Sequence, residues 1–157
     1  MAESSVETLK QNKRPFIQIN SIKQNCLFTK TRIQKCTFQM LIDTGSVASL
    51  ISKSSFDKLG LSADILAKVS TTLTAVDGSE MTVYGQITLK FSLSNKVFEH
   101  EFIVADIHET SGILGMGFLE KFDASIIVSI SGHKIRLYKL GFTTCAHIKS
   151  SENIETE

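Results

Sequence analysis

Asp43 is the side chain in this sequence that is best placed to do chemistry. It follows the apolar run Met40-Leu41-Ile42 and enters a turn of small residues, Thr44, Gly45 and Ser46. The apolar run favours burial, whereas a carboxylate resists burial unless hydrogen bonds or a shared proton compensate its desolvation. Two interpretations are open at this point: an active-site carboxylate, or an Asx turn in which Asp43 accepts a bond from the amide two residues on.

Other site chemistries find no support in the residue spacing. The sequence has no Gly-x-Ser-x-Gly elbow, no G-x-x-x-x-G-K-[ST] loop, no Gly-x-Gly-x-x-Gly and no His-Glu-x-x-His. The dispersed histidines are predicted to be surface or packing residues rather than metal ligands: His100, His108, His133 and His147. Three cysteines without Cys-x-x-Cys spacing predict free thiols in a reducing compartment: Cys26, Cys36 and Cys145. No metal or cofactor is expected.

Length and charge indicate one domain without a polyanionic partner. A chain of 157 residues can bury its own core, and its net charge is +1. Basic residues up to Lys35 outnumber Glu3 and Glu7, but only Phe16 and Phe28 lie among them for stacking, so a solvated strand face is predicted rather than nucleic-acid binding. No apolar run approaches the roughly 20 residues that span a bilayer, and no signal sequence is evident. We expect a soluble cytoplasmic chain without membrane contact.

The elements that would deliver Asp43 are extended. Residues 1–14 predict a flexible leader that ends at Pro15. Alternation predicts a strand over 16–20 and a long extended stretch over 27–42, whose end presents Asp43.

A short helix is predicted after the turn. Residues 48–51 predict a short strand, and Ser52 is expected to cap a helix of about two turns. Phe56 and Leu59 would face inward, and Gly60 would end the helix.

Hairpins are predicted in the middle of the chain. Asp77-Gly78 lies between the alternating segments 73–75 and 81–83, which is a strong hairpin signal. A half-buried strand is predicted over 87–93 and its return over 97–105.

A glycine-bracketed apolar strand and a short helix follow over 112–122. Further strands are predicted at 126–130 and 135–137, with an extra pairing strand at 142–148 and a disordered tail over 149–157. The total of about nine short strands and two short helices predicts an all-β fold.

Three segments in this order resemble the retroviral-type aspartic proteases, or retropepsins, most closely those of long-terminal-repeat retrotransposons. The segments are Leu41-Ile42-Asp43-Thr44-Gly45-Ser46 as active-site signature, Ala75-Val76-Asp77-Gly78-Ser79 as flap, and Gly112-Ile113-Leu114-Gly115-Met116-Gly117-Phe118-Leu119 as closing strand and helix. The resemblance implies a small closed β-barrel-like acid-protease fold over residues 15–138, with a flap hairpin and one or two short helices. Residues 139–157 would be an extension with a candidate interface strand.

The resemblance also implies a two-fold homodimer. Hydrolysis by this route needs two carboxylates that share one proton, and the chain has one Asp-Thr-Gly, so a second copy would supply the other. Such a pair would favour mildly acidic to near-neutral pH. Asp43 would be the catalytic acid and base, and Thr44 would join the two signature loops. Gly45 would admit substrate backbone, and Ser46 would bond the outer oxygen of Asp43.

The implied partner besides the second copy is an extended peptide or polyprotein. The flap would clamp it by adding strand-like backbone bonds, through Val76, Asp77, Gly78 and Ser79. Ile113, Leu50 and Val76 would form apolar pocket walls, with core packing an open alternative for Leu50.

Two positions depart from the retroviral pattern. Val47 and Met116 stand where many members have an acidic residue and an arginine, which predicts a packing contact in place of an ion pair. Gly117 stands where retrotransposon relatives often carry an acidic residue.

The implied function is a homodimeric aspartic endopeptidase that processes a retroelement polyprotein, in the cytoplasm or within a retroelement particle. The alternative is a non-catalytic dimerisation or peptide-binding module on the same fold. The related ubiquitin-linked proteases are not favoured, because nothing ubiquitin-like precedes Pro15.

Overall fold

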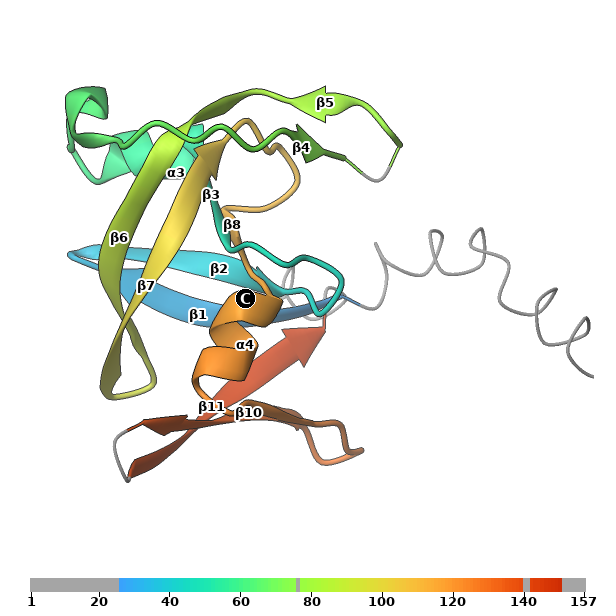
Figure 1. Cartoon of the computed structure of the whole chain (residues 1–157). Coiled ribbons are helices and arrows are strands. Elements are labelled where there is room, and N and C mark those ends of the chain that lie inside the picture. Colours follow the sequence, from blue (N-terminus) through green and yellow to red (C-terminus); the bar gives the residue numbers. More distant parts are fainter. Residues whose placement is uncertain (1–25, 76, 140–141, 151–157) are drawn as a thin grey trace, which may run out of the picture.

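Six strands close into a barrel at the centre of the chain (Figure 1). The structure, a computed structural model, describes residues 26–75, 77–139 and 142–150. The barrel strands are β1 (Leu27–Ile33), β2 (Cys36–Ile42), β3 (Leu50–Ser52), β6 (Val83–Leu93), β7 (Lys96–Ala105) and β8 (Gly112–Leu114). They pair in the order β2, β8, β3, β7, β6, β1, and the pairing of β1 with β2 closes the ring. The predicted closed all-β fold is confirmed.

The segment 27–42 is a hairpin, which corrects the expectation of one long extended stretch. β1 and β2 pair antiparallel, from Leu27 opposite Ile42 to Ile33 opposite Cys36. The chain reverses at Gln34, whose φ is 55°. Both arms keep the same alternation, and the turn lacks the glycine or asparagine that usually marks a positive φ, so no residue marks this reversal in advance.

The longest hairpin joins β6 and β7, as predicted. Its inward residues alternate with exposed ones because successive side chains of a strand point to opposite faces. The large buried side chains are Leu89, Phe91, Leu93, Phe98, Phe102 and Val104. Ser94, with a φ of 57°, makes the turn between the two strands.

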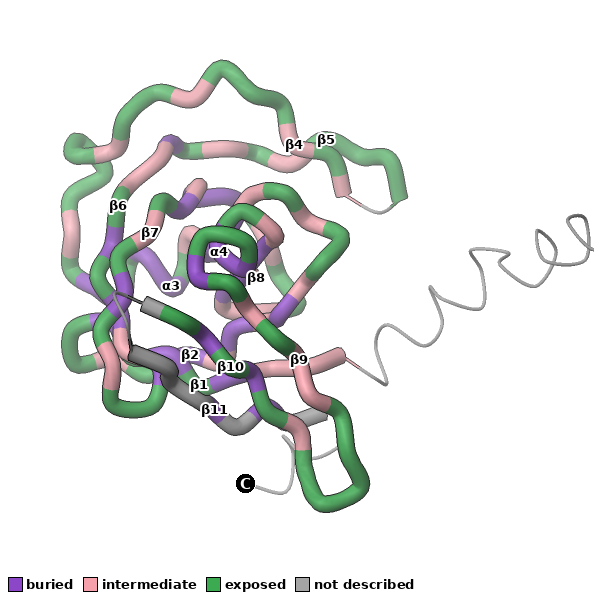
Figure 2. Tube along the Cα trace, turned by 60° about the horizontal axis from the view of Figure 1, so that its bottom comes forward, coloured by how far each residue is buried: buried purple, intermediate pink, exposed green. Residues whose placement is uncertain are grey.

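The predicted Gly-tipped hairpin is also present. β4 (Leu73–Thr74) and β5 (Glu80–Met81) form a separate two-stranded sheet. Gly78, with a φ of 88°, lies at its tip and donates its N–H to Ala75 O at 2.9 Å. In Figures 1 and 2 this hairpin reaches out beyond the barrel. We call it the flap hairpin below.

Two short α-helices accompany the barrel in the part of the chain that the structure describes. α3 (Lys53–Lys58) begins as predicted at Ser52, whose hydroxyl accepts a hydrogen bond from Ser55 N. The 3-10 turn η1 (Ala63–Ile65) follows it. The second helix, α4 (Met116–Lys121), comes directly after β8 and Gly115.

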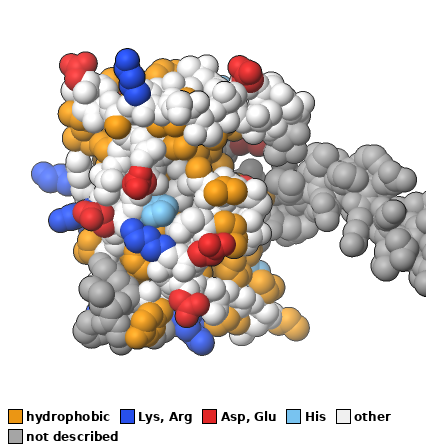
Figure 3. All heavy atoms as spheres, viewed as in Figure 1, with side chains coloured by type: hydrophobic (Ala, Val, Ile, Leu, Met, Phe, Trp, Pro, Cys, Tyr) orange, Lys and Arg blue, Asp and Glu red, His pale blue; other side chains and the backbone are white. Residues whose placement is uncertain are grey.

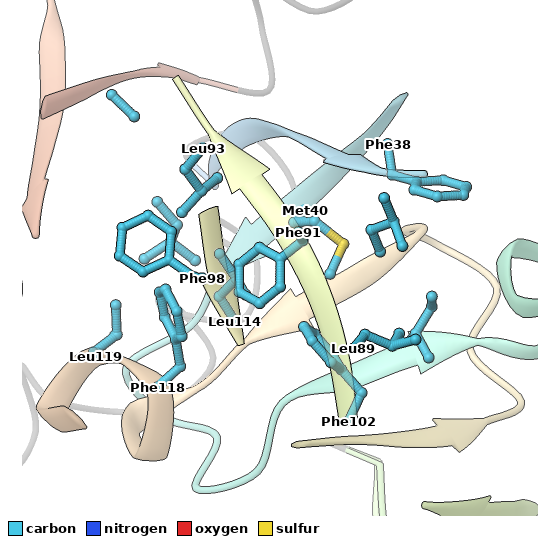
Figure 4. Packing of buried hydrophobic residues seen from close by; sticks show 14 of the residues in the cluster. Phe38, Met40, Leu89, Phe91, Leu93, Phe98, Phe102, Leu114, Phe118 and Leu119 are labelled. Carbon is cyan, nitrogen blue, oxygen red and sulfur yellow. The ribbon is translucent and has the colours of Figure 1, made fainter. Parts of the chain in front are cut away.

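Aromatic packing anchors α4 to the barrel (Figure 4). The Phe118 ring lies 5.5 Å from that of Phe91 and 5.9 Å from that of Phe98, measured between ring centroids. Leu119 is buried beside it. His100 packs edge-on against Phe118, and this burial, with the charge of Lys121, lowers the pKa of the His100 imidazole. A neutral imidazole at neutral pH fits the apolar surroundings of the helix.

Three further strands extend the sheet from β1. These are β11 (Phe142–Ser150), β10 (His133–Lys139) and β9 (Ser125–Ile127), which lie in that order. β11 pairs with β10 from Phe142 to Ile148, and its last two residues, Lys149 and Ser150, pair with β1. Ala146 and Ile148 of β11 are buried.

The predicted strand over 126–130 is shorter than expected. Pairing with β10 ends where Ile127 lies opposite Lys134. Beyond it the hydroxyl of Ser129 donates to Gly132 O at 2.6 Å and Gly132 has a φ of 135°, so the chain turns there instead of continuing as a strand. The predicted leader over 1–14, the strand over 16–20 and the end of the tail over 151–157 lie outside the described residues.

Candidate active site

Asp43 lies directly after the last residue of β2, where the neighbouring strand β8 fixes it. β2 and β8 run parallel, with Ile42 opposite Leu114. The N–H of Asp43 donates to Leu114 O at 3.0 Å, so the backbone remains bonded one residue beyond the strand. The Asp43 side chain is half-buried, whereas Thr44 and Gly45 are exposed. A carboxylate is therefore presented at the surface from a rigid strand end.

An Asx turn holds the Asp43 carboxylate. Its Oδ1 accepts a hydrogen bond from Gly45 N at 2.8 Å, and the N–H of Ser46 bonds Asp43 O at 3.3 Å. A β-carbon at Gly45 would lie 3.2 Å from Oδ1, which is tight, so glycine suits this approach. The Asx turn expected as the alternative to a site is thus present, and it leaves the carboxylate partly open.

The Ser46 hydroxyl has a different partner from the one expected. It donates to Ala48 O at 2.7 Å rather than to the outer oxygen of Asp43. The reason is local: the carbonyl two residues on lies within the turn, while the Gly45 amide already bonds the carboxylate. A supporting role of Ser46 in catalysis stays a prediction.

The turn sits on the start of α4 through backbone contacts. Met116 N donates to Ser46 O at 2.6 Å, and Gly117 N donates to Val47 O at 2.9 Å. The Val47 side chain is 82% exposed, so the expected packing contact with Met116 is not how these segments meet. Backbone bonds join them instead.

Gly115 makes this close approach feasible. A β-carbon there would lie 2.6 Å from Ser46 O and would also clash with the carbonyl of Ala48. Glycine is therefore required where the turn crosses the chain between β8 and α4.

Ser49 is a positioning residue that the sequence reasoning missed. Its side chain is buried, and its Oγ accepts a hydrogen bond from Gly115 N at 3.0 Å. Its carbonyl accepts from Ile103 N at 3.0 Å, which ties the turn to β7 as well. A serine between Ala48 and Leu50 carries no signal of this long-range role.

Cys26, a titratable neighbour of Asp43, and Glu109, whose charge also acts on Cys26, were not predicted from the sequence either. Burial raises the pKa of the Cys26 thiol, and the negative charges of Asp43 and Glu109 raise it further. Extending the β1–β2 register by one residue places Cys26 opposite Asp43. This neighbour follows from the hairpin at Gln34, which no residue of the turn marks in the sequence.

The flap hairpin carries the other predicted contacts with a peptide. Asp77 Oδ1 accepts bonds from the N–H of Ser79 at 2.9 Å and from its hydroxyl at 2.6 Å, and these bonds lower the pKa of Asp77. Val76 lies outside the described residues. In Figure 3 the surface is hollowed beneath the overhang of this hairpin.

The two predicted pocket residues lie opposite each other in neighbouring strands. Leu50 of β3 pairs with Ile113 of β8. Ile113 is half-buried, and Leu50 is buried with 4% of its surface exposed. A role as pocket walls stays a prediction for both residues.

The described residues include no group of three or more His, Cys, Asp or Glu side chains arranged to hold a metal ion. In the same part of the chain, every helix is too short or too polar to cross a membrane.

Solved structures with this fold define the class. The retroviral protease-like domain of Ddi1 from Leishmania major superposes with a TM-score of 0.59 at 15% identity, covering 80% of this chain and 94% of that one. A retropepsin-like aspartic protease from Rickettsia conorii gives 0.54 at 21%, covering 78% and 85%. The EIAV protease in complex with the inhibitor HBY-793 gives 0.51 at 20%, covering 64% and 91%. The fold is that of the retropepsin-like aspartic proteases.

The sequence assigns the family. Residues 29–121, more than half of the chain, match the family described as "gag-polyprotein putative aspartyl protease", and the chain belongs to that family. The predicted resemblance to retropepsins is confirmed. A comparison with curated proteins finds no match.

Proposed function

We propose that the chain is a homodimeric aspartic endopeptidase that acts through two copies of Asp43. The observation that carries this proposal is how Asp43 is positioned. Its carboxylate is half-exposed at the end of a strand, its N–H bonds Leu114 O of β8, and the turn that follows it bonds the first amides of α4. An Asx turn that only capped a strand would not need Gly115 and the buried Ser49 beneath it. Contacts that fix the turn so closely support a catalytic role for its carboxylate.

The dimer follows from the chemistry. The family's route needs two carboxylates close enough to share one proton, because two charges so close cannot both persist. One Asp-Thr-Gly per chain makes the site incomplete in a single copy. A two-fold axis beside the turn would bring the two Asp43 side chains together, with the exposed Thr44 of each copy at the contact.

In the proposed reaction, the ionised Asp43 takes a proton from a water, whose oxygen attacks the scissile carbonyl carbon. The protonated Asp43 of the other copy gives its proton to the carbonyl oxygen, which leaves a neutral tetrahedral diol. On collapse, one diol hydroxyl returns its proton to this second carboxylate as the carbonyl re-forms. The C–N bond breaks, and the first carboxylate protonates the leaving nitrogen, which restores the starting state.

The proposed substrate is an extended peptide within a retroelement polyprotein, including the flanks of the protease itself. The family description, which names a gag polyprotein, supports this class. The flap hairpin is a separate two-stranded sheet, and the outer edge of such a sheet suits strand-like bonding to a peptide. We place the reaction in the cytoplasm or within a retroelement particle.

Replacement of the carboxylate tests the proposal. Asp43→Asn keeps the size of the side chain and removes its acid and base function, so hydrolysis of peptides with apolar residues around the scissile bond is expected to fall at least about a thousandfold. Asp64→Asn is the matched control, because Asp64 is an exposed aspartate of η1. A statine-type transition-state mimic should inhibit the wild type.

Cleavage that persists in Asp43→Asn would refute the mechanism. A wild-type protein that binds peptides and dimerises but cleaves none would instead favour the binding or dimerisation module. The two outcomes are separated by measuring peptide binding and hydrolysis on the same preparations.

A further inference from the structure

The part of the sheet that extends beyond the barrel carries charge of one sign. It consists of β1, β11, β10 and β9, which neighbour one another in that order. The sequences of these four strands contain no Asp or Glu, although the whole chain has 16 acidic and 17 basic residues. In the β6–β7 hairpin, by contrast, Lys90 lies opposite Glu99. Protein surfaces usually mix charges of both signs, so these strands mark a candidate interaction surface.

Four cations are exposed on these strands. They are Lys30 and Arg32 of β1 and Lys134 and Arg136 of β10, which we call the basic face below. The residues between them, Thr31 and Ile135, are fully buried, as expected where successive side chains of a strand point to opposite sides. Arg32 Nε donates to Gln34 O at 3.2 Å, within its own hairpin. In the part of the chain that the structure describes, none of the four cations is held in an ion pair.

The register of β11 joins the two pairs of cations into one surface. Residues directly opposite each other in an antiparallel pair lie on the same side of the sheet. Position 149 of β11 lies opposite Phe28 of β1, and position 147 lies opposite Lys134 of β10. Positions two apart share a side, so the exposed cations of β1 and of β10 belong to the same side of the sheet. In Figure 1 the strands β10 and β11 lie together below β1.

Tyr138 adds an aromatic ring to the row of cations on β10. It follows Lys134 and Arg136 at the same two-residue spacing, and it is 51% exposed. Ser125 of β9, opposite Arg136, is exposed and uncharged. Exposed aromatic rings beside Lys and Arg on a sheet suit single-stranded nucleic acid, because the cations attract phosphates and the rings stack on bases.

The strand pairing argues against a peptide as the occupant. Lys134 and Arg136 have β9 on one side and β11 on the other, so a peptide cannot add as a strand at these positions. The occupant must lie across the side chains instead. The cations of each pair are two residues apart, about 7 Å along the strand, which suits the successive phosphates of an extended chain.

We propose that the basic face binds single-stranded nucleic acid, with phosphates on its four cations and a base stacked on Tyr138. From the sequence, the basic residues up to Lys35 predicted only a solvated strand face, because few aromatic residues lie among them. The fold brings the distant Arg136 and Tyr138 to the same side, which spacing along the chain does not reveal. The inference goes beyond the proposed hydrolysis and uses no residue of the Asp43 turn or of the flap hairpin.

The salt dependence of binding tests the cations. The probe is a fluorescent oligouridylate of about 12 nucleotides, followed by anisotropy. Four phosphate contacts to a single strand predict that log K falls with log salt at a slope of about −2.8, so affinity should fall about fiftyfold between about 50 and 200 mM salt. Lys30→Gln combined with Arg136→Gln removes two contacts, and the fall should shrink to about sevenfold.

A matched control removes two charges elsewhere. Lys58 and Lys68 are exposed lysines outside the four strands, so Lys58→Gln combined with Lys68→Gln should keep the wild-type affinity and slope. Thermal unfolding of both double variants verifies that the fold is retained.

The aromatic ring is tested separately. Tyr138→Ala should weaken binding about fivefold or more at each salt concentration without changing the slope, because it removes one stacked base and no charge. Tyr84→Ala is the matched control, since Tyr84 is 44% exposed and lies on β6. It should bind as the wild type does.

Four results would overturn the proposal. The first is a wild type that does not bind the oligouridylate, and the second is a Lys30/Arg136 variant with the same slope as the Lys58/Lys68 control. The third is equal binding by Tyr138→Ala and Tyr84→Ala. The fourth is tighter binding of the wild type to phosphatidylserine vesicles or to polyglutamate than to the oligouridylate, which would assign the face to a membrane or to an acidic peptide.

Discussion

At the scale of single residues, two neighbours define the surroundings of the Asp43 carboxylate. Its Oδ1 accepts a hydrogen bond from the Gly45 amide, and its negative charge contributes to the raised pKa of the Cys26 thiol. The carboxylate is thus neither in bulk water nor fully enclosed. This combination makes the charge of Asp43 measurable through its neighbour.

Cys26 alkylation reports that charge. Burial, then Asp43, then Glu109 raise the pKa of the Cys26 thiol, so its thiolate fraction is low at neutral pH. Asp43→Asn removes one negative charge and lowers this pKa, and we expect iodoacetamide to modify Cys26 about twofold faster or more at pH about 8. Mass spectrometry of the labelled peptides measures the rate, and Cys36 serves as internal reference. An unchanged ratio of the two rates would show that Asp43 does not act on Cys26.

The sequence predicted Asp43 as the candidate site residue and predicted the turn that follows it, because a carboxylate between an apolar run and small residues is a local pattern. It did not predict Ser49 or Cys26 as neighbours of the site. Their roles depend on the register of distant strands: Ser49 meets Gly115, and Cys26 faces Asp43 only because the chain reverses at Gln34. Such partners cannot be inferred from spacing alone.

At the scale of elements, the Asp43 turn depends on the junction between β8 and α4. The turn's carbonyls bond the first amides of α4, and the helix itself is packed against the barrel through Phe118. The sequence predicted this strand and helix correctly, since glycines bracket an apolar run. Its expectation of a side-chain contact between Val47 and Met116 failed, because backbone bonds already join the two segments.

Gly115→Ala is predicted to displace the turn. The added methyl group would lie 2.6 Å from Ser46 O, and backbone cannot yield as a side chain does, so we expect a loss of about 1–3 kcal/mol in the free energy of unfolding. Gly117→Ala is the matched control, since its methyl group would lie 3.1 Å from Val47 O and needs only a small shift. Denaturant unfolding measures both. Equal stability of Gly115→Ala and the wild type would mean that the junction is looser than described.

At the scale of the whole molecule, a closed barrel carries an appended sheet. The barrel strands form a closed ring, so the sheet edges among the described residues lie in β9 and in the flap hairpin. Alternation predicted the all-β class, and the resemblance to retropepsins implied the closed barrel. The end of β9 at Ile127 was not, because exposed apolar residues such as Ile130 continue the strand pattern into the turn.

The appended sheet is predicted to share the core of the barrel. Ile148 of β11 is only 4% exposed and belongs to the main apolar cluster, so Ile148→Ala should lower the free energy of unfolding by about 2–4 kcal/mol. Ile65→Ala, at a half-exposed position, should change it by less than about 0.5 kcal/mol. Chemical denaturation compares them. Equal small losses would indicate that β11 is peripheral to the fold.

The central claim is that each active site uses Asp43 from two copies, and mixing tests it most directly. Wild type and Asp43→Asn are combined in equal amounts at fixed total concentration, allowed to exchange subunits, and assayed for peptide hydrolysis. If both carboxylates are required, only dimers of two wild-type chains are active, and the mixture should retain about one quarter of the wild-type activity. Retention of about one half, as for chains that act independently, would contradict the shared site.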